Sequence, residues 1–397
     1  MKKGLIIKLV IIIFLLIIFL IVDYNFITLE VVQNDIVIEV NSDYILEEVR
    51  GTYNGKDITD KIEVTNTIDK YNVGEYIVEY KGFGYVMSKS FILNVKVVDS
   101  QPPILKLKGT SFQPVNNNYK ELGYIVSDNY YSENEIDVTI QSDVNFNFID
   151  GVNTIEYKAI DKSGNVSYQY RDVYYDPEYE NTDFTAENFV MPNISSIATK
   201  NELAITMEEL KNNYLFVGDS IIRDMGYNGI LPGESVAAYP CLGPNNLVGT
   251  VCTYYNDENN WRDVPTIVLE EQPKFIIINF GLCALEIDSF KDTLDNFQKT
   301  INLLSWYSKD TKISIVSILP TLNNDVGNKP SNETINTFNY YLARLCESNQ
   351  IPFINVATVL KSENGYGNED YYFNDGYHLN VEGEKVYYDY IVNHLNK

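Results

Sequence analysis

The residue with the clearest chemical potential is Ser220, which follows Gly218 and Asp219. The four residues before this trio, 214–217, are apolar, as in a buried parallel strand, and apolar residues at helical spacing follow it. A serine there lies at the carboxyl edge of a sheet and at a helix N-terminus, which suits a nucleophile whose reaction develops negative charge. Asp and Ser are also ordinary helix N-caps, so this segment alone leaves nucleophile and cap open.

A serine nucleophile needs a base, and the chain has two histidines. His394 lies close to the C-terminal end, where chains often fray. His378 follows Asp375 by three residues, so the carboxylate can accept the Nδ1 proton while Nε2 faces Ser220. Asp375-Gly376 favours a turn, which places the pair in a loop. Taken alone, His378 would be interpreted as a surface histidine, but together with Ser220 it predicts a Ser-His-Asp triad.

Together these two segments resemble the SGNH (GDSL) hydrolases, and the resemblance covers Asn213 to Lys397. It implies esterase or acyltransferase chemistry and an oxyanion hole made by the serine amide, a glycine amide and an asparagine side chain. Ser220 supplies the first. Gly243 stands where the family glycine is expected, although a turn glycine is the alternative.

The third oxyanion position departs from the family pattern, because Cys283 stands where the asparagine is expected. A thiol is a weak donor, and losing one oxyanion donor costs on the order of 100- to 1000-fold in rate. A nearby asparagine can substitute, or the site is slow or specialised; the candidates are Asn245, Asn246 and Asn279. Cys283 as the nucleophile is disfavoured because Ser220 already fills that role.

Strand and helix patterns alternate after residue 213, which predicts a three-layer α/β domain with a parallel sheet over 213–397. Apolar runs at 275–280, 313–318 and 351–356 are the expected buried strands. A polar, acidic segment, 177–212, is predicted to be an extended linker.

The N-terminal half is predicted to hold a membrane anchor, residues 1–24, and two all-β sandwiches, 25–99 and 100–176. The basic flank and the lack of a cleavage signal favour an uncleaved, single-pass anchor with the bulk of the chain outside the cell. The two β segments repeat one another and resemble bacterial Ig-like surface domains, which act as spacers or adhesive modules. The segment 161–165 has too few ligands for a calcium loop and is predicted to be a tight turn.

The net charge and the cysteine spacing limit the classes of partner and ligand that we expect. The net charge of −25 argues against nucleic acid, which is bound by basic surfaces. The spacing of the four cysteines indicates no metal site, and we expect no metal or cofactor. Cys241–Cys252 is the pair nearest in sequence, but free buried cysteines are equally compatible with the pattern.

The sequence therefore predicts a multidomain, membrane-anchored extracellular bacterial enzyme. It would be an esterase or O-acyltransferase that moves an acyl group, in the first place acetyl, on cell-wall or surface glycan. A lipase or thioesterase is a subordinate reading of the same triad. The alternative from another class is a surface adhesion or scaffold protein whose SGNH-like half has lost activity.

Overall fold

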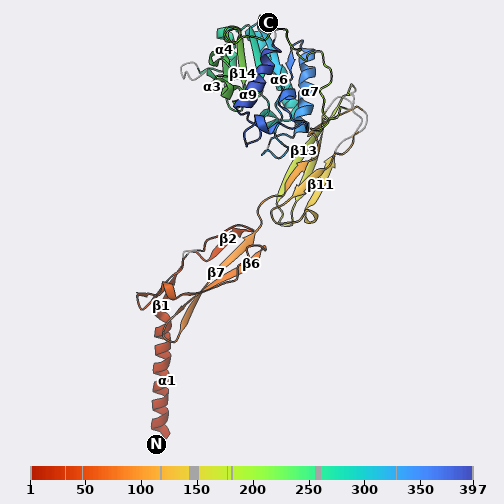
Figure 1. Cartoon of the computed structure of the whole chain (residues 1–397). Helices are drawn as coiled ribbons and strands as arrows, with labels where there is room; N and C mark the ends of the chain where they lie inside the picture. Colours follow the sequence, from red (N-terminus) through yellow and green to blue (C-terminus); the bar gives the residue numbers. More distant parts are fainter. Residues whose placement is uncertain are drawn as a thin grey trace. The chain divides into compact units, whose positions relative to one another are not determined.

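The computed structural model of the chain describes all residues except 1, 32, 47, 117–118, 143–151, 177, 180–181, 255–260, 328 and 396–397 (Figure 1). The chain divides into two compact units. The first consists of Met1–Lys106, Val126–Thr139 and Lys158–Tyr168, and the second of Leu107–Ile125, Ile140–Tyr157 and Gln169–Lys397.

The first unit begins with helix α1 (Lys2–Asn25), whose apolar side chains are exposed. Its 24 residues span about 36 Å, enough for a hydrocarbon core of about 30 Å. Among the described residues, α1 is the helix that is long and apolar enough to cross a membrane. Near its end, the buried Asp23 carboxylate accepts hydrogen bonds from Tyr53 Oη and from the N–H groups of residues 85–87. These bonds attach the helix end to the strands that follow.

The first β segment contains two sheets with the strand orders β2-β7-β6-β5 and β1-β3-β4. Strands β5, β6 and β7 pair antiparallel, and β2 pairs parallel with β7. Alternating residues of β6 and β7 form the core with Val49: Val78, Tyr80, Leu93 and Val95. The strands are β1 (Ile27–Glu30), β2 (Asp35–Glu39), β3 (Arg50–Tyr53), β4 (Lys56–Asp57), β5 (Glu63–Asn66), β6 (Gly74–Phe83) and β7 (Ser88–Val98).

The second β segment also contains two sheets, with the orders β10-β8 and β11-β12-β13-β9. Many β strands are confirmed for the N-terminal half, whereas the Ig-like identity of the two segments stays a prediction. Gly151, part of the predicted repeat, lies outside the described residues. The strands are β8 (Ile104–Leu107), β9 (Phe112–Val115), β10 (Tyr124–Ser127), β11 (Asp137–Ser142), β12 (Val152–Ile160) and β13 (Val166–Tyr175).

The predicted boundary at residue 176 does not separate two independent bodies. Part of the second β segment belongs to the second unit together with the α/β domain. Phe112 of β9 stacks on Phe290, with ring centroids 3.6 Å apart, and meets Tyr341 edge-on. Because these rings are packed together, strand β9 of this segment lies directly against the α/β domain.

The segment 177–212 is predicted to be an extended linker, but residues of its described part pack onto the α/β domain. Phe184 and Ile194 lie in its core, and Ile197 bridges to strand β19 (Phe353–Ile354). The polar start of the segment suggested a linker, but these apolar side chains gain more from burial than from exposure.

The α/β domain has a six-stranded sheet in the order β16-β15-β14-β17-β18-β19, parallel except at β16. The predicted parallel sheet is therefore confirmed. Its remaining strands are β14 (Tyr214–Gly218), β15 (Val236–Ala238), β16 (Thr253–Tyr254), β17 (Phe275–Asn279) and β18 (Lys312–Val316). The helices are α2 (Met207–Asn213), α3 (Ser220–Tyr227), α4 (Val264–Glu271), α5 (Ala284–Ile287), α6 (Phe290–Tyr307), α7 (Asn332–Ser348), α8 (Ala357–Leu360) and α9 (Val381–Val392).

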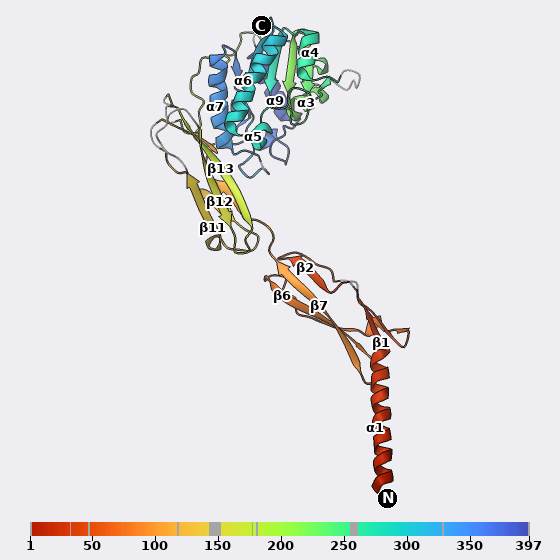
Figure 2. The same cartoon turned by 180° about the vertical axis from the view of Figure 1, so that it is seen from behind.

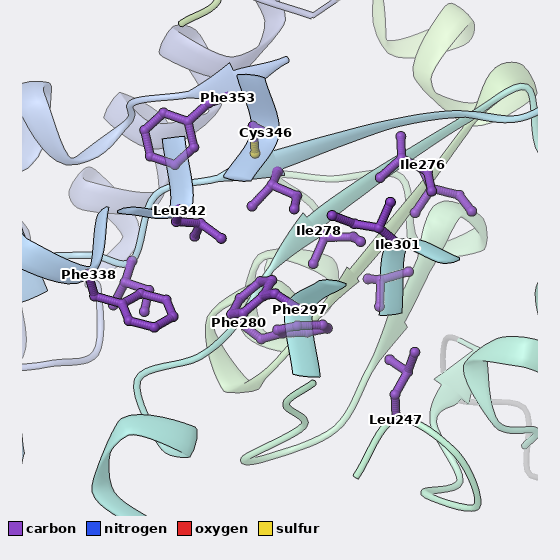
Figure 3. Close-up of a cluster of buried hydrophobic side chains, with 14 of the residues drawn as sticks. Leu247, Ile276, Ile278, Phe280, Phe297, Ile301, Phe338, Leu342, Cys346 and Phe353 are labelled. Carbon is purple, nitrogen blue, oxygen red and sulfur yellow. The ribbon is translucent and has the colours of Figure 1, made fainter. Parts of the chain in front are cut away.

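Alternation along the central strand divides the core into two layers. Leu215 and Val217 join the cluster under α4, α6 and α7, part of which is drawn in Figure 3. Tyr214 and Phe216 join the cluster on the opposite face, with α2, α3, α8 and α9. Figure 2 shows the α6 and α7 side of the domain. Strand β14 is the third of the six strands and is buried on both faces. The turn after it therefore lies near the centre of the carboxyl edge of the sheet.

Candidate active site

The turn from β14 to α3 is built by Gly218 and Asp219. A Cβ on Gly218 would lie 2.3 Å from Ile222 Cγ1 and 2.7 Å from the Asn279 carbonyl oxygen, so only glycine fits. The Asp219 carboxylate caps α3 by accepting the Ile221 N–H at 3.0 Å. Asp219 therefore takes the capping role, and the side chain of Ser220 is left for another partner.

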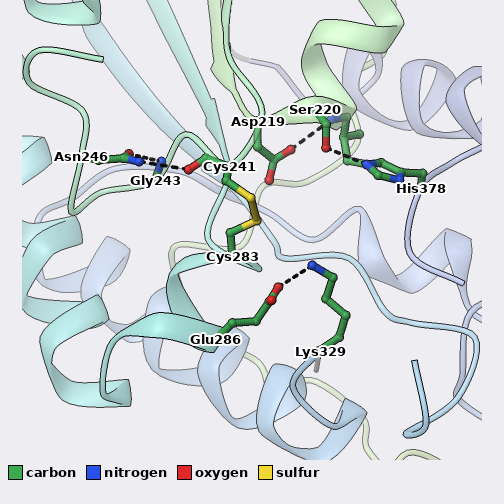
Figure 4. The surroundings of a disulfide bond; sticks show 10 residues. Asp219, Ser220, Cys241, Gly243, Asn246, Cys283, Glu286, Lys329 and His378 are labelled. Carbon is green, nitrogen blue, oxygen red and sulfur yellow. Dashed lines mark hydrogen bonds and ion pairs between the residues drawn. A yellow bond between two sulfur atoms is a disulfide. The ribbon is translucent and has the colours of Figure 1, made fainter. Parts of the chain in front are cut away.

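That partner is His378, 158 residues further along the chain. Ser220 Oγ lies 2.8 Å from His378 Nε2 (Figure 4), and His378 Nδ1 lies 2.7 Å from Asp375 Oδ2. The structure thus brings together the three residues that the sequence predicts as a triad. This order of hydroxyl, imidazole and carboxylate is the one that general-base activation of a hydroxyl requires.

A turn orients the acid and the base. Asp375 Oδ1 accepts hydrogen bonds from the backbone N–H groups of Tyr377 and His378, at 3.2 and 3.1 Å. Between them Gly376 has a φ of +81°, a conformation that favours glycine. Burial opposes ionisation of Asp375, but the hydrogen bonds from the His378 side chain and these N–H groups lower its pKa below the ordinary 3.8. At neutral pH this carboxylate is ionised and can hold the imidazole.

Asp219 is a second carboxyl group beside Ser220. It is buried, and burial raises its pKa to about 6, against the opposing effect of the Ile221 N–H. The sequence indicates Asp219 as a possible helix N-cap, which the structure shows it to be, but the raised pKa could not be predicted because a buried cap and an exposed cap have the same sequence. The site therefore holds two carboxyl groups whose surroundings move their pKa values in opposite directions.

The predicted oxyanion donor Gly243 is engaged elsewhere in this conformation. Its N–H donates to Asn246 Oδ1 at 2.7 Å, and Asn246 Nδ2 donates to the Cys241 carbonyl at 3.1 Å (Figure 4). Asn246, named as a possible substitute donor, is thus bonded within its own loop. The Gly243 amide can serve an oxyanion only after Asn246 moves.

The predicted thiol donor is absent, because Cys283 forms a disulfide with Cys241 and has no S–H (Figure 4). The two Cα atoms are 5.5 Å apart. This pairing corrects both the sequence-nearest pair Cys241–Cys252 and the side-chain donor role of Cys283. Cys252 and Cys346 are free and buried. The disulfide joins the loop after β15 to the loop after β17, the strands on either side of β14.

Asn279 ends β17 and lies against the same small space as Ser220. Its Nδ2 donates to the Ser317 carbonyl at 3.1 Å. An amide nitrogen carries two hydrogens, so one remains for a ligand. Asn245 instead places Oδ1 3.0 Å from the position that a Cβ on Gly243 would occupy.

The cavity beside Ser220 has a volume of about 30 Å³ and includes Leu282, Cys283 and Tyr377 in its lining. Lys329 also lines it, but its Nζ donates to Glu286 Oε1 at 2.5 Å and lies 4.3 Å from the Tyr377 ring centre. The positive charge at this cavity is therefore already paired with a carboxylate.

Comparison with known proteins places this domain. Residues 216–386 match the model of the GDSL-like Lipase/Acylhydrolase family. Over 170 residues the chain is 26% identical to an N-acylneuraminate cytidylyltransferase of Streptococcus agalactiae serotype V, covering 41% of this chain and 39% of that protein. The chain thus spans well under half the length of this curated relative.

Solved structures also resemble this part of the chain. A GDSL-like lipase from Bacteroides thetaiotaomicron VPI-5482 is 16% identical, with a TM-score of 0.34, and covers 47% of this chain and 88% of that one. A carbohydrate esterase family 3 protein from Talaromyces cellulolyticus is 14% identical, with a TM-score of 0.31. The match covers 45% of this chain and 93% of the esterase chain. The C-terminal part of this chain, residues 216–386, is thus similar to the GDSL-like lipase/acylhydrolase family.

Proposed function

We propose that the C-terminal domain is a serine esterase or O-acyltransferase in which Ser220, His378 and Asp375 are the catalytic residues. The observation that carries this proposal is the relay of two hydrogen bonds, 2.8 Å from Ser220 Oγ to His378 Nε2 and 2.7 Å from His378 Nδ1 to Asp375 Oδ2. The three residues come from two segments far apart in sequence, and each is supported by its own local hydrogen bonds.

In this mechanism Ser220 Oγ attacks the carbonyl carbon of an ester while His378 Nε2 takes the hydroxyl proton. The tetrahedral intermediate collapses by breaking the bond to the leaving alkoxide, which receives that proton, and an acyl-Ser220 ester remains. Water, or a sugar hydroxyl, then attacks the acyl carbon while His378 takes its proton. The bond from the acyl carbon to Ser220 Oγ breaks, Ser220 recovers the proton from His378, and the acid or the new ester is released. Asp375, ionised at neutral pH, stabilises the imidazolium formed in each half.

The size of the cavity supports a small acyl group. The cavity beside Ser220 has a volume of only about 30 Å³. An acetyl group adds one methyl beyond the carbonyl, whereas a fatty acyl chain needs a long apolar channel. We therefore propose acetyl transfer or hydrolysis in preference to lipase chemistry.

The developing oxyanion has one donor that is ready. The Ser220 N–H lies in the first turn of α3, where backbone N–H groups lack intrahelical partners. The second donor is the Gly243 amide once Asn246 releases it, and the remaining hydrogen of Asn279 Nδ2 is a third candidate. A site with fewer preset donors is slower, by about 100- to 1000-fold per donor.

Two features of the chain, helix α1 and the disulfide, support an extracellular location for the domain. Helix α1 is long and apolar enough to anchor the chain, and the Cys241–Cys283 disulfide fits an oxidising compartment. We propose that α1 stays in the membrane, that the Ig-like segments form a stalk, and that the substrate is an O-acylated cell-wall or surface glycan. A sugar hydroxyl as second acceptor would make the enzyme a transferase.

A non-catalytic scaffold is the second candidate. It is favoured by the engaged Gly243 amide and by the missing donor at Cys283. In that case the triad would be a remnant that no longer turns over ester.

The test uses the full chain in detergent micelles with a chromogenic acetyl ester, next to Ser220→Ala and His378→Ala. The enzyme reading expects hydrolysis that both variants lose, and labelling of the parent by a fluorophosphonate that Ser220→Ala abolishes. Assays with an O-acetylated glycan, with and without a sugar acceptor, then distinguish hydrolysis from transfer. Parent hydrolysis equal to that of the variants, together with an unlabelled Ser220, would establish the scaffold reading.

A further inference from the structure

Three aspartates in the first unit come together from separate segments. Asp99 follows β7, Asp128 follows β10 and Asp161 follows β12. One carboxylate oxygen of each lies within 4.8 Å of the corresponding oxygens of the other two. The loop at Asp161 alone has too few ligands for calcium, whereas the fold supplies two more carboxylates.

Two of these carboxylates have an oxygen with no hydrogen-bond donor. Asp99 is only 5% exposed, yet its Oδ1 has no partner, and Asp128 Oδ2 is buried and likewise unpartnered. An unpaired buried carboxylate oxygen costs several kcal/mol or shifts the group toward its neutral form. The cluster thus lacks a positive partner in the form described here.

The other carboxylate oxygens are held in place. Asp128 Oδ1 accepts from the N–H groups of residues 130–131, each at 2.9 Å. Asn165 serves the other two: its N–H donates to Asp161 Oδ1 at 2.9 Å, and its Nδ2 to Asp161 Oδ2 at 2.8 Å and to Asp99 Oδ2 at 3.4 Å. The carboxylates are therefore oriented before any ligand arrives, which lowers the entropic cost of binding one.

No basic side chain within the described ranges forms an ion pair with these three aspartates. The lysine in the same loop, Lys162, is paired with Glu135 at 2.6 Å. Three negative charges within a few ångströms repel one another strongly where burial limits screening. A bound cation would supply the missing partner for both unpartnered oxygens at once.

We propose that Asp99, Asp128 and Asp161 bind one calcium ion. Calcium takes six to eight oxygen ligands in flexible geometry, so three carboxylates with water completing the shell suffice. Magnesium demands a near-ideal octahedron and gives up water reluctantly, which this loosely spaced set does not favour. Extracellular calcium modules bind in the range of about 0.1 to 1 mM, and this site belongs in that range. The ion would hold the chain after β7 to the loops after β10 and β12.

The test is a calcium titration of the full chain in detergent micelles after chelator treatment, followed by calorimetry and by thermal unfolding. We expect one calcium ion per chain, and at ten times the dissociation constant the folded state should gain about tenfold in its equilibrium over the unfolded state. Asp99→Asn and Asp161→Asn should weaken calcium binding at least tenfold. Asp60→Asn, an exposed carboxylate of the same unit, is the matched control and should bind as the parent does.

Folding of the variants is checked separately. Without calcium, Asp99→Asn should unfold at the same temperature as the parent or above it, because the change removes one repelling charge. Asp128→Asn, at a less buried position, provides a second variant. Calcium binding that is absent in the parent, equal in the parent and both Asp99→Asn and Asp161→Asn, or matched by magnesium at the same concentration would overturn the proposal.

Discussion

The two halves of the candidate active site are built in different ways. The relay of Ser220, His378 and Asp375 is complete, with each hydrogen bond within 2.8 Å. On the other side, the loops after β15 and β17 supply a Gly243 amide that is already bonded and a Cys283 side chain locked in a disulfide.

The difference follows from how each half is encoded. The relay depends on short local patterns: Gly218 permits the close turn, Asp219 caps the helix, and Asp375 holds its own loop through backbone N–H groups. The oxyanion half depends on two loops that meet only in the folded domain. The comparison teaches that the nucleophile and its base can be complete while the donors for the oxyanion still need a rearrangement.

The largest effect is expected from Ser220→Ala, which removes the nucleophile and leaves the oxyanion half intact. We expect the acetyl-ester kcat to fall by about 10⁴-fold or more. Ser289→Ala, which removes a helix-capping serine of α6, is the matched control and should keep its activity. A residual rate in Ser220→Ala near that of the parent would show that the relay does not carry the reaction.

Asp375→Asn tests the other end of the relay. The amide preserves the shape but no longer stabilises the imidazolium, so we expect kcat to fall by about 10³- to 10⁴-fold with little change in KM.

Asp375 also has a signature in the pH dependence of stability. Because its pKa is lowered on folding, its contribution is fully present above the ordinary value of 3.8 and is lost as the pH falls below it. Chemical denaturation between pH 3 and 5 should show this loss in the parent and its absence in Asp375→Asn. Identical pH profiles would contradict the assigned hydrogen bonds.

Replacing both Cys241 and Cys283 with alanine breaks the oxyanion half and spares the relay. The disulfide closes a segment with a sequence separation of 42. Chain-entropy arguments then put the loss of stability at about 4 kcal/mol, and we expect kcat to fall about tenfold as the two loops loosen. A reductant should produce the same change in the parent and none in the double variant. Sensitivity of the double variant to reductant would point to another thiol.

Asp219→Asn tests the buried carboxyl group that caps α3, whose pKa shifts in the opposite direction to that of Asp375. Folding raises the Asp219 pKa to about 6, so its contribution to stability is present below 3.8 and is lost as the pH rises through 6. At pH 8 the variant should be more stable than the parent by up to about 3 kcal/mol, since an amide caps the helix without a buried charge. Denaturant titrations at pH 4 and pH 8 measure this, and an equal difference at both pH values would contradict the shift.

The last pair of variants changes Asn246, whose side chain accepts the Gly243 N–H. Asn246→Asp places a negative charge beside that amide and should lower kcat about tenfold. Asn246→Ala removes the competing acceptor and should change kcat by less than about threefold, upward if the release of Gly243 limits the rate. Equal kcat values for Asn246→Asp and Asn246→Ala would show that the Gly243 amide does not serve as an oxyanion donor.

Much of the α/β domain and of the relay could be predicted from sequence. The apolar run before Gly218 and the strand runs at 275–280 and 313–318 are buried parallel strands in the structure. The resemblance to GDSL hydrolases that Gly218-Asp219-Ser220 and Asp375-x-x-His378 predict is confirmed by the family model over 216–386. These inferences succeed because strand burial, capping and turns act over a few residues.

The sequence by itself determined the Gly218-Asp219-Ser220 turn, the Asp375–His378 loop and the alternation of strands and helices, since each rests on contacts between near neighbours in the chain. Only the tertiary structure decided that Cys241 pairs with Cys283, that Asn246 occupies the Gly243 amide, and that 177–212 packs on the domain. It also brought Asp99, Asp128 and Asp161 together. These features depend on which loops and faces meet after the chain folds, and no local pattern of residues records that meeting.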